Sequence, residues 1–151
     1  MFLFNFPQTN RYINMRAKKT RKKPKVLLVE TSGYMRGLLK LVVNLHKKQV
    51  FELHIVDSGQ KALELIGEDE QFDAVVFDLN GWLWLPSFFS FEAAEKIRRL
   101  NDKIAIIASV CCDSCFDPQR CKEIGMYKMA DDGFSTNLNN IESALAECSV
   151  I

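Results

Sequence analysis

The chain has 151 residues, 48% of them hydrophobic, which is enough for one domain with a real core. No apolar stretch approaches the roughly 20 residues that span a bilayer, and the apolar run at residues 1–6 is too short for a signal peptide. The five cysteines, an odd number, favour a reducing intracellular compartment over a disulfide-stabilised secreted scaffold.

Charge is segregated along the chain. Of 20 basic and 19 acidic residues, eight basic and no acidic ones lie in residues 1–25, which leaves a net charge of minus seven for the remainder. We expect residues 1–24 to form a disordered basic arm whose deletion barely changes the melting temperature, and residues 25–151 to form the folded domain. The arm has several competing interpretations. It is a flexible tail, a nuclear localisation signal, a segment that contacts nucleic acid or a membrane, or an organellar presequence.

The first half of the domain is predicted to hold two strand–helix units. Strands are expected at residues 25–30 and 51–56. A turn at residues 31–33 supplies the N-cap of a helix that runs to about residue 47, and a second helix begins at Ser58 and ends at Gly67. Helical spacing assigns core-facing positions to Met35, Leu38, Leu39, Val42 and Leu45 in the first helix, and to Ala62, Leu63, Leu65 and Ile66 in the second.

Residues 73–78 form a short apolar run that ends in a carboxylate, Asp78. Such a run is typical of a parallel strand that is buried on both faces. Asp78 then lies at the carboxyl edge of the sheet, where ligands bind in open α/β folds. The alternative role for Asp78 is to cap the segment that follows.

The second half continues the alternation after an aromatic-rich connection at residues 79–89. Strands are predicted at residues 103–109 and 126–130, and a short helix at residues 118–124 is stopped by Gly125. Two further helices are read from their apolar stripes: Phe91, Ala94, Ile97 and Leu100, and then Leu138, Ile141, Ala144, Leu145 and Cys148.

Five strands that alternate with five helices predict a flavodoxin-like, doubly wound, five-stranded parallel sheet in three layers. Glu30, Asp78 and Ser109 follow three of the strands. In the flavodoxin-like strand order these side chains converge, with the two carboxylates within about 10 Å of each other.

Two other groups of residues have competing interpretations. The aromatic residues Trp82, Trp84, Phe88 and Phe89 form either a core plug or an exposed docking patch beside the site. The cysteines at 111, 112 and 115, followed by Cys121, contain a Cys-x-x-Cys, but no second pair completes a zinc site, and no zinc is expected. His46 and His54 are interpreted as structural.

Across about residues 25–148 the chain resembles the receiver domain of two-component response regulators. The matching segments, in order, are KVLLVE at 25–30, DSGQKAL at 57–63, DAVVFD at 73–78, EAAEKIR at 92–98 and IIAS at 106–109. The resemblance implies that Asp78 accepts a phosphoryl group from a phosphohistidine and that Ser109 binds the phosphoryl oxygens. It also implies a Mg²⁺ site, here formed by Glu30, Asp78 and the backbone carbonyl of Asn80, and a histidine kinase or phosphotransfer protein as partner.

The departures from the receiver pattern indicate a degenerate, or pseudo-, receiver, loosely similar to atypical plant response regulators. Thr31 stands where the principal metal-binding acid is expected, and Asp132 and Gly133 replace the Lys-Pro pair after the last strand. Each lost charge-assisted contact costs about 1.5–3 kcal/mol. The magnesium site is therefore expected to be weak.

The favoured function is a non-enzymatic, receiver-like signalling module of a His-to-Asp phosphorelay, located in the nucleus or cytoplasm. Its phosphoacceptor site is expected to be impaired, and the module is expected to act through protein–protein contacts. One alternative is a working phosphoacceptor receiver that uses Asp78. The other is a nucleic-acid-binding protein that acts through its basic arm.

Overall fold

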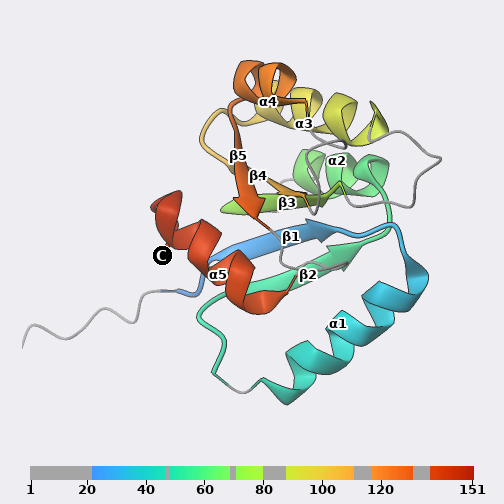
Figure 1. Ribbon diagram of the computed structural model, residues 1–151, viewed down its shortest axis with the longest axis vertical. Coiled ribbons are helices and arrows are strands. Elements are labelled where there is room, and N and C mark those ends of the chain that lie inside the picture. The colour runs from blue at the N-terminus through green and yellow to red at the C-terminus, as the bar shows by residue number, and fades with distance from the viewer. Residues whose placement is uncertain (1–21, 47, 69–70, 80–87, 111–116, 131–136) are drawn as a thin grey trace, which may run out of the picture.

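The computed structural model describes residues 22–46, 48–68, 71–79, 88–110, 117–130 and 137–151, with only the backbone at 88–90 and 130 (Figure 1). The predicted basic arm lies almost entirely outside these residues. Strands and helices alternate along the chain: β1 Lys25–Val29, α1 Gly33–Leu45, β2 Glu52–Val56, α2 Gly59–Gly67, β3 Ala74–Asp78, α3 Phe88–Leu100, β4 Ala105–Val110, α4 Pro118–Ile124, β5 Met126–Ala130 and α5 Leu138–Glu147.

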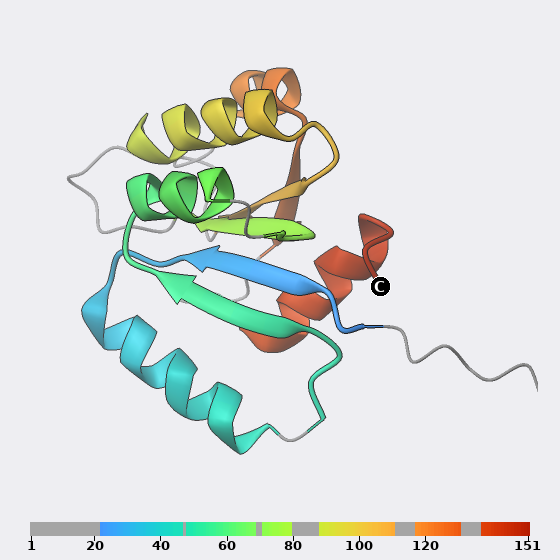
Figure 2. The ribbon, with the colours of Figure 1, turned by 180° about the vertical axis from the view of Figure 1, so that it is seen from behind.

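The strands form one parallel sheet in the order β2-β1-β3-β4-β5, as the sequence predicted. The central strands are buried on both faces because their side chains alternate between two apolar cores. Leu27 and Val29 of β1 belong to the core under α2, α3 and α4, whereas Val26 and Leu28 belong to the core under α1 and α5. Figures 1 and 2 show these two helix layers on opposite faces of the sheet, which confirms the three-layer architecture.

Side-chain caps fix where several helices begin. Ser32, Ser58 and Asn137 have extended backbone and accept a hydrogen bond from the backbone N–H three residues on, at the starts of α1, α2 and α5. Asp117 does the same for α4, with Pro118 in the first turn. Gly125 ends α4 with φ of +73°, a left-handed conformation that glycine adopts without strain.

One arginine joins three elements at the amino edge of the sheet. From the last turn of α3, Arg98 donates from Nε to the carbonyl of Ile124 at 3.0 Å and from Nη2 to that of Gly125 at 3.2 Å. Its Nη1 donates to the carbonyls of Asp102 at 2.8 Å and Ile104 at 2.9 Å. The guanidinium group thus supplies charged donors to carbonyls at the end of α4 and before β4.

Three of the predicted core positions are wrong. Leu38 and Leu45 of α1 are 42% and 70% exposed, and Leu100 at the end of α3 is 62% exposed. In α1 only Leu39 is buried, with Val42 and Val43 partly buried against the same core. The helix itself was predicted correctly. Its apolar residues occupy two faces, however, and only one of these faces packs on the sheet. Leu100 is the last residue of its helix, where the packed face has ended.

Candidate functional site

The candidate site lies at the carboxyl edge of the sheet, where the ends of β1, β3 and β4 are aligned. Val29 is the register partner of Phe77, and Asp78 is the register partner of Ser109. Glu30 directly follows Val29, and Leu79 donates its backbone N–H to the carbonyl of Ser109 at 3.0 Å. Neighbouring strands are about 4.8 Å apart. The register therefore places Glu30, Asp78 and Ser109 on three adjacent strand ends.

Burial differs among these three residues. Glu30 and Ser109 are buried, with exposures of 3% and 0%, and Asp78 is half-buried. Asp78 and Ser109 both have polar or electrostatic partners. The arrangement combines one shielded carboxylate, one accessible carboxylate and one shielded hydroxyl.

Glu30 has one satisfied and one unsatisfied carboxylate oxygen. Its Oε1 accepts the backbone N–H of Ser32 at 2.7 Å. Its Oε2 is buried and has no hydrogen-bond partner among the described residues. A buried carboxylate oxygen without a donor is costly, and a cation or an ordered water is the usual remedy. This oxygen fits a magnesium site, which typically takes one or two carboxylates and several waters.

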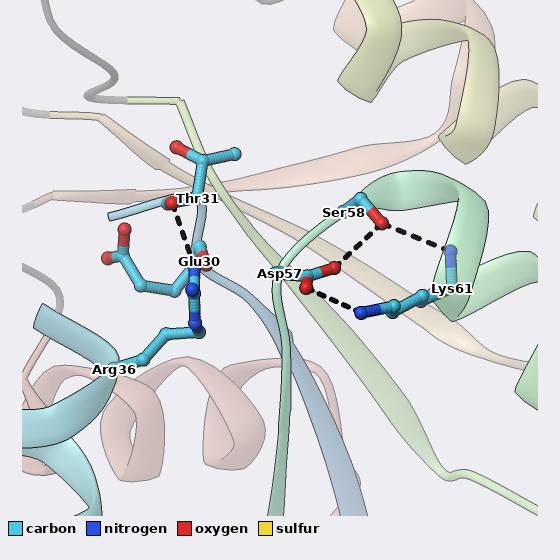
Figure 3. Close-up of polar contacts among 6 residues, drawn as sticks. All are labelled: Glu30, Thr31, Arg36, Asp57, Ser58 and Lys61. Atoms are coloured by element: carbon cyan, nitrogen blue, oxygen red, sulfur yellow. Dashed lines mark hydrogen bonds and ion pairs between the residues drawn. The ribbon is translucent and has the colours of Figure 1, made fainter. Parts of the chain in front are cut away.

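Thr31 is exposed, and its backbone is held by a cation (Figure 3). Nη1 of Arg36 donates to the carbonyl of Glu30 at 2.9 Å and to that of Thr31 at 2.8 Å. The guanidinium group therefore fixes the path of the chain after β1. No carboxylate stands at position 31 to serve as a second metal ligand.

A second polar cluster at this edge follows β2, and the sequence interpretation missed it. Asp57 accepts from Lys61 Nζ at 2.5 Å and from Ser58 Oγ at 3.0 Å (Figure 3). These bonds, that of Lys61 first, lower the pKa of Asp57 below its ordinary value of 3.8, and the charge of Arg36 acts in the same direction. An acid that follows a strand, with a lysine four residues on, was the available signal. Lys61 is therefore ion-paired with Asp57, where β2 ends at the carboxyl edge of the sheet.

Several predicted site residues lie outside the described part of the chain. These are Asn80, Trp82, Trp84, Asp132 and Gly133, together with the cysteines at 111, 112 and 115. Phe88 and Phe89 form the first turn of α3, but their side chains are not described. The proposed docking patch, the carbonyl ligand and the missing lysine thus remain predictions from the sequence.

The described cysteines, and one of the two histidines, lie in packed or hydrogen-bonded surroundings. Cys121 is buried in α4 and Cys148 is half-buried at the end of α5, and burial raises the pKa of both thiols. His54 contacts Phe72 edge to face and shares a hydrogen bond with Glu52 at 2.7 Å. Among residues outside the gaps, no three His, Cys, Asp or Glu side chains gather closely enough to hold a metal ion alone.

No helix in the described ranges has the length and apolar character to cross a membrane.

A parallel sheet in this strand order, with helices on both faces, is a flavodoxin-like α/β domain, and here acids and a hydroxyl lie at the ends of β1, β3 and β4. Two rice proteins named as two-component response regulators are similar to the chain. ORR5 is 25% identical over 116 residues, which are 77% of this chain and 68% of that protein. ORR11 is 29% identical over 105 residues, which are 68% of this chain and 66% of that protein. The chain is thus similar to proteins named as response regulators and spans about two thirds of their length.

Solved structures show the same fold. A complex of the Saccharomyces cerevisiae histidine phosphotransfer protein Ypd1 with the receiver domain of Ssk1 matches with a TM-score of 0.62 and 20% identity, over 85% of this chain and 90% of that chain. The chemotaxis response regulator CheY4 of Vibrio cholerae matches with a TM-score of 0.59 and 18% identity, over 83% and 98%. No family model matches the chain. The receiver fold predicted from the sequence is therefore confirmed.

Proposed function

We propose that the chain is a receiver-like signalling module of a His-to-Asp phosphorelay, that its phosphoacceptor site is impaired, and that it acts through protein contacts rather than catalysis. The observation that carries the proposal is the composition of the site edge. Glu30, Asp78 and Ser109 occupy three adjacent strand ends, but the neighbouring Thr31 brings no second acid. These three residues support the assignment of a receiver-like site, and the uncharged Thr31 supports its impairment.

In a working site, the carboxylate of Asp78 would attack the phosphorus of a phosphohistidine. The new oxygen–phosphorus bond forms as the nitrogen–phosphorus bond breaks, and the imidazole of the donor leaves with the electron pair. Such transfer depends mostly on positioning and on neutralising the phosphoryl charge. Ser109, the register partner of Asp78, would hold a phosphoryl oxygen.

Magnesium would be held by Glu30, Asp78 and the Asn80 carbonyl and would offset the phosphoryl charge when bound. The unsatisfied Oε2 of Glu30 supports this assignment, and Thr31 weakens it. The sequence also places an anion, Asp132, where a receiver has its lysine. Two carboxylates with an added anion repel each other and the incoming phosphoryl group. We therefore expect slow labelling and weak metal binding.

The test is phosphoryl transfer from a phosphohistidine donor to the full chain. Wild-type protein should label weakly, and Asp78→Asn should abolish what labelling there is. The double variant Thr31→Asp with Asp132→Lys should gain both labelling and Mg²⁺ affinity, because it restores the missing ligand and the missing cation. Each single change should do less, since charges in one network couple.

Two results would contradict the proposal. Wild-type labelling as fast as that of an active receiver would establish the alternative, a working phosphoacceptor at Asp78. Labelling of the double variant no better than wild type would show that charge is not what limits the site and would point to the connection at residues 79–89.

Tryptophan emission on addition of Mg²⁺ gives an independent readout of metal binding, since Trp82 and Trp84 lie in that connection.

A further inference from the structure

Helix α1 carries an exposed apolar stripe that its own domain does not use. Four large side chains make up this stripe and are exposed to 79%, 42%, 56% and 70%, respectively: Tyr34, Leu38, Leu41 and Leu45. They include most of the exposed large hydrophobic residues in the described part of the chain. Figures 1 and 2 show α1 at the margin of the molecule, with one side turned away from the sheet. Exposed apolar patches of this kind mark interaction sites.

The stripe is separate from the face that packs on the sheet. At about 100° per residue, its four members fall within about 60° of one another around the helix. Buried Leu39 lies roughly 130° from the middle of the stripe. The stripe therefore remains available for contact while α1 stays packed through Leu39, Val42 and Val43.

The spacing of the stripe makes it complementary to a second copy of itself. Its members follow one another at intervals of four, three and four residues, the spacing of a coiled-coil seam. These intervals read the same in both directions along the helix. When two copies of α1 lie antiparallel about a two-fold axis, Tyr34 of each faces Leu45 of the other, and Leu38 faces Leu41. Every member of the stripe thus meets another member, as an isologous interface requires.

Charge does not oppose this pairing. The residues that flank the stripe, Met35 and Val42 on one side and Gly37 and Asn44 on the other, are all uncharged. The two cations of α1, Arg36 and Lys40, lie about 170° and 130° around the helix from the stripe. Antiparallel packing also sets the dipoles of the two helices head to tail.

From this geometry we infer that two copies of this chain associate through an antiparallel pairing of their α1 helices. The stripe covers about 16 Å of helix, from residue 34 to residue 45 at 1.5 Å per residue. With a helix width of about 10 Å, its footprint is on the order of 160 Å². That is far less than the roughly 800 Å² per partner that stable dimers bury. The dimer is therefore weak and reversible, and it forms at high micromolar concentration.

The experiment measures the mass of the full chain by sedimentation from about 5 to 500 μM, a range in which weak reversible dimers appear. The mass of wild-type protein should rise toward twice the monomer mass. Leu38→Lys and Leu41→Glu should each remain monomeric, because either change places a charge opposite a leucine of the partner. Leu100→Glu removes an exposed leucine from α3, 62% exposed, and should dimerise like wild type. Circular dichroism checks that all variants are folded.

Mixing the two monomeric variants tests the direction of the pairing. In the antiparallel arrangement, the lysine introduced into one chain faces the glutamate introduced into the other. The unchanged Leu41 of the first chain then faces the unchanged Leu38 of the second, so the mixture should regain the dimer. A parallel arrangement gives no such match.

Three results would overturn the proposal: wild-type protein that stays monomeric at about 500 μM, dimers that persist in Leu41→Glu, or a mixture of the two variants that stays monomeric. Association only with an added partner protein would do so as well and would assign the stripe to that partner.

Discussion

The guanidinium group of Arg98 donates to the carbonyl of Ile124, 26 residues further along the chain, at 3.0 Å. With three further carbonyls bound by the same group, this contact joins α3, α4 and the start of β4. We expect Arg98→Ala to lower the free energy of unfolding by about 2–3 kcal/mol, because it leaves several carbonyls without a charged donor. Urea unfolding measures the change. Arg99→Ala is the matched control, since Arg99 is exposed, and it should have almost no effect.

Two glycines should respond in opposite directions to replacement by alanine. Gly37 lies inside α1, where an added Cβ meets nothing within 4 Å, so Gly37→Ala should stabilise the fold by about 0.5–1 kcal/mol. Gly125 has φ of +73°, so Gly125→Ala should destabilise the fold by about 1–2 kcal/mol through backbone strain. Thermal unfolding in dilute solution measures both changes. Equal effects of the two substitutions would contradict this assignment of the glycines.

The phenol of Tyr127 in β5 donates a hydrogen bond to Glu147 near the end of α5. This bond, with desolvation, raises the pKa of Tyr127 from 10.0 to about 12. The folded state therefore keeps the proton where the unfolded state has lost it. The resulting stabilisation is complete below pH 10 and is lost as the pH rises toward 12. Ultraviolet absorbance should show one late-ionising phenol, which Glu147→Gln moves to lower pH and the control Glu142→Gln does not.

The Asp57 carboxylate should respond to the loss of Lys61. Because the Lys61 hydrogen bond is the largest cause of the lowered pKa of Asp57, Lys61→Met should raise that pKa toward its ordinary value of 3.8. Carboxyl-carbon NMR chemical shifts through an acid titration measure it. Lys40→Met removes an exposed lysine of α1 and should leave Asp57 unchanged. An Asp57 pKa that does not move in Lys61→Met would mean that the pair is open in solution.

The strands were predictable because continuous apolar runs are typical of buried parallel strands. The runs that end at Glu30 and Asp78 are both of this kind. The order of the strands followed from the flavodoxin-like arrangement that five alternating strand–helix units predict. Local rules also located the first N-cap within residues 31–33, Ser58 as the second cap and Gly125 as a helix end. The predicted end of α2 at Gly67 is confirmed as well, with Glu68 as its C-cap at a φ of −88°.

What the sequence did not reveal depends on tertiary geometry. A helical period shows that α1 has apolar positions, but it does not say which of them meet the sheet, and Leu38 and Leu45 were misassigned for that reason. The contacts of Arg36 and Arg98 use backbone carbonyls, which leave no pattern in side-chain chemistry. Asp57 was overlooked because its importance at the edge depends on β2 lying beside β1.

The hydrogen bonds from Arg36 to the segment after β1 affect which substitutions this segment can accept during evolution. Both hydrogen bonds end on main-chain oxygens, those of Glu30 and Thr31, so the path of the backbone does not depend on which side chain occupies position 31. An acid can be lost or regained there without rebuilding the loop. A single substitution at position 31 therefore changes the charge at this edge of the sheet while the scaffold stays the same.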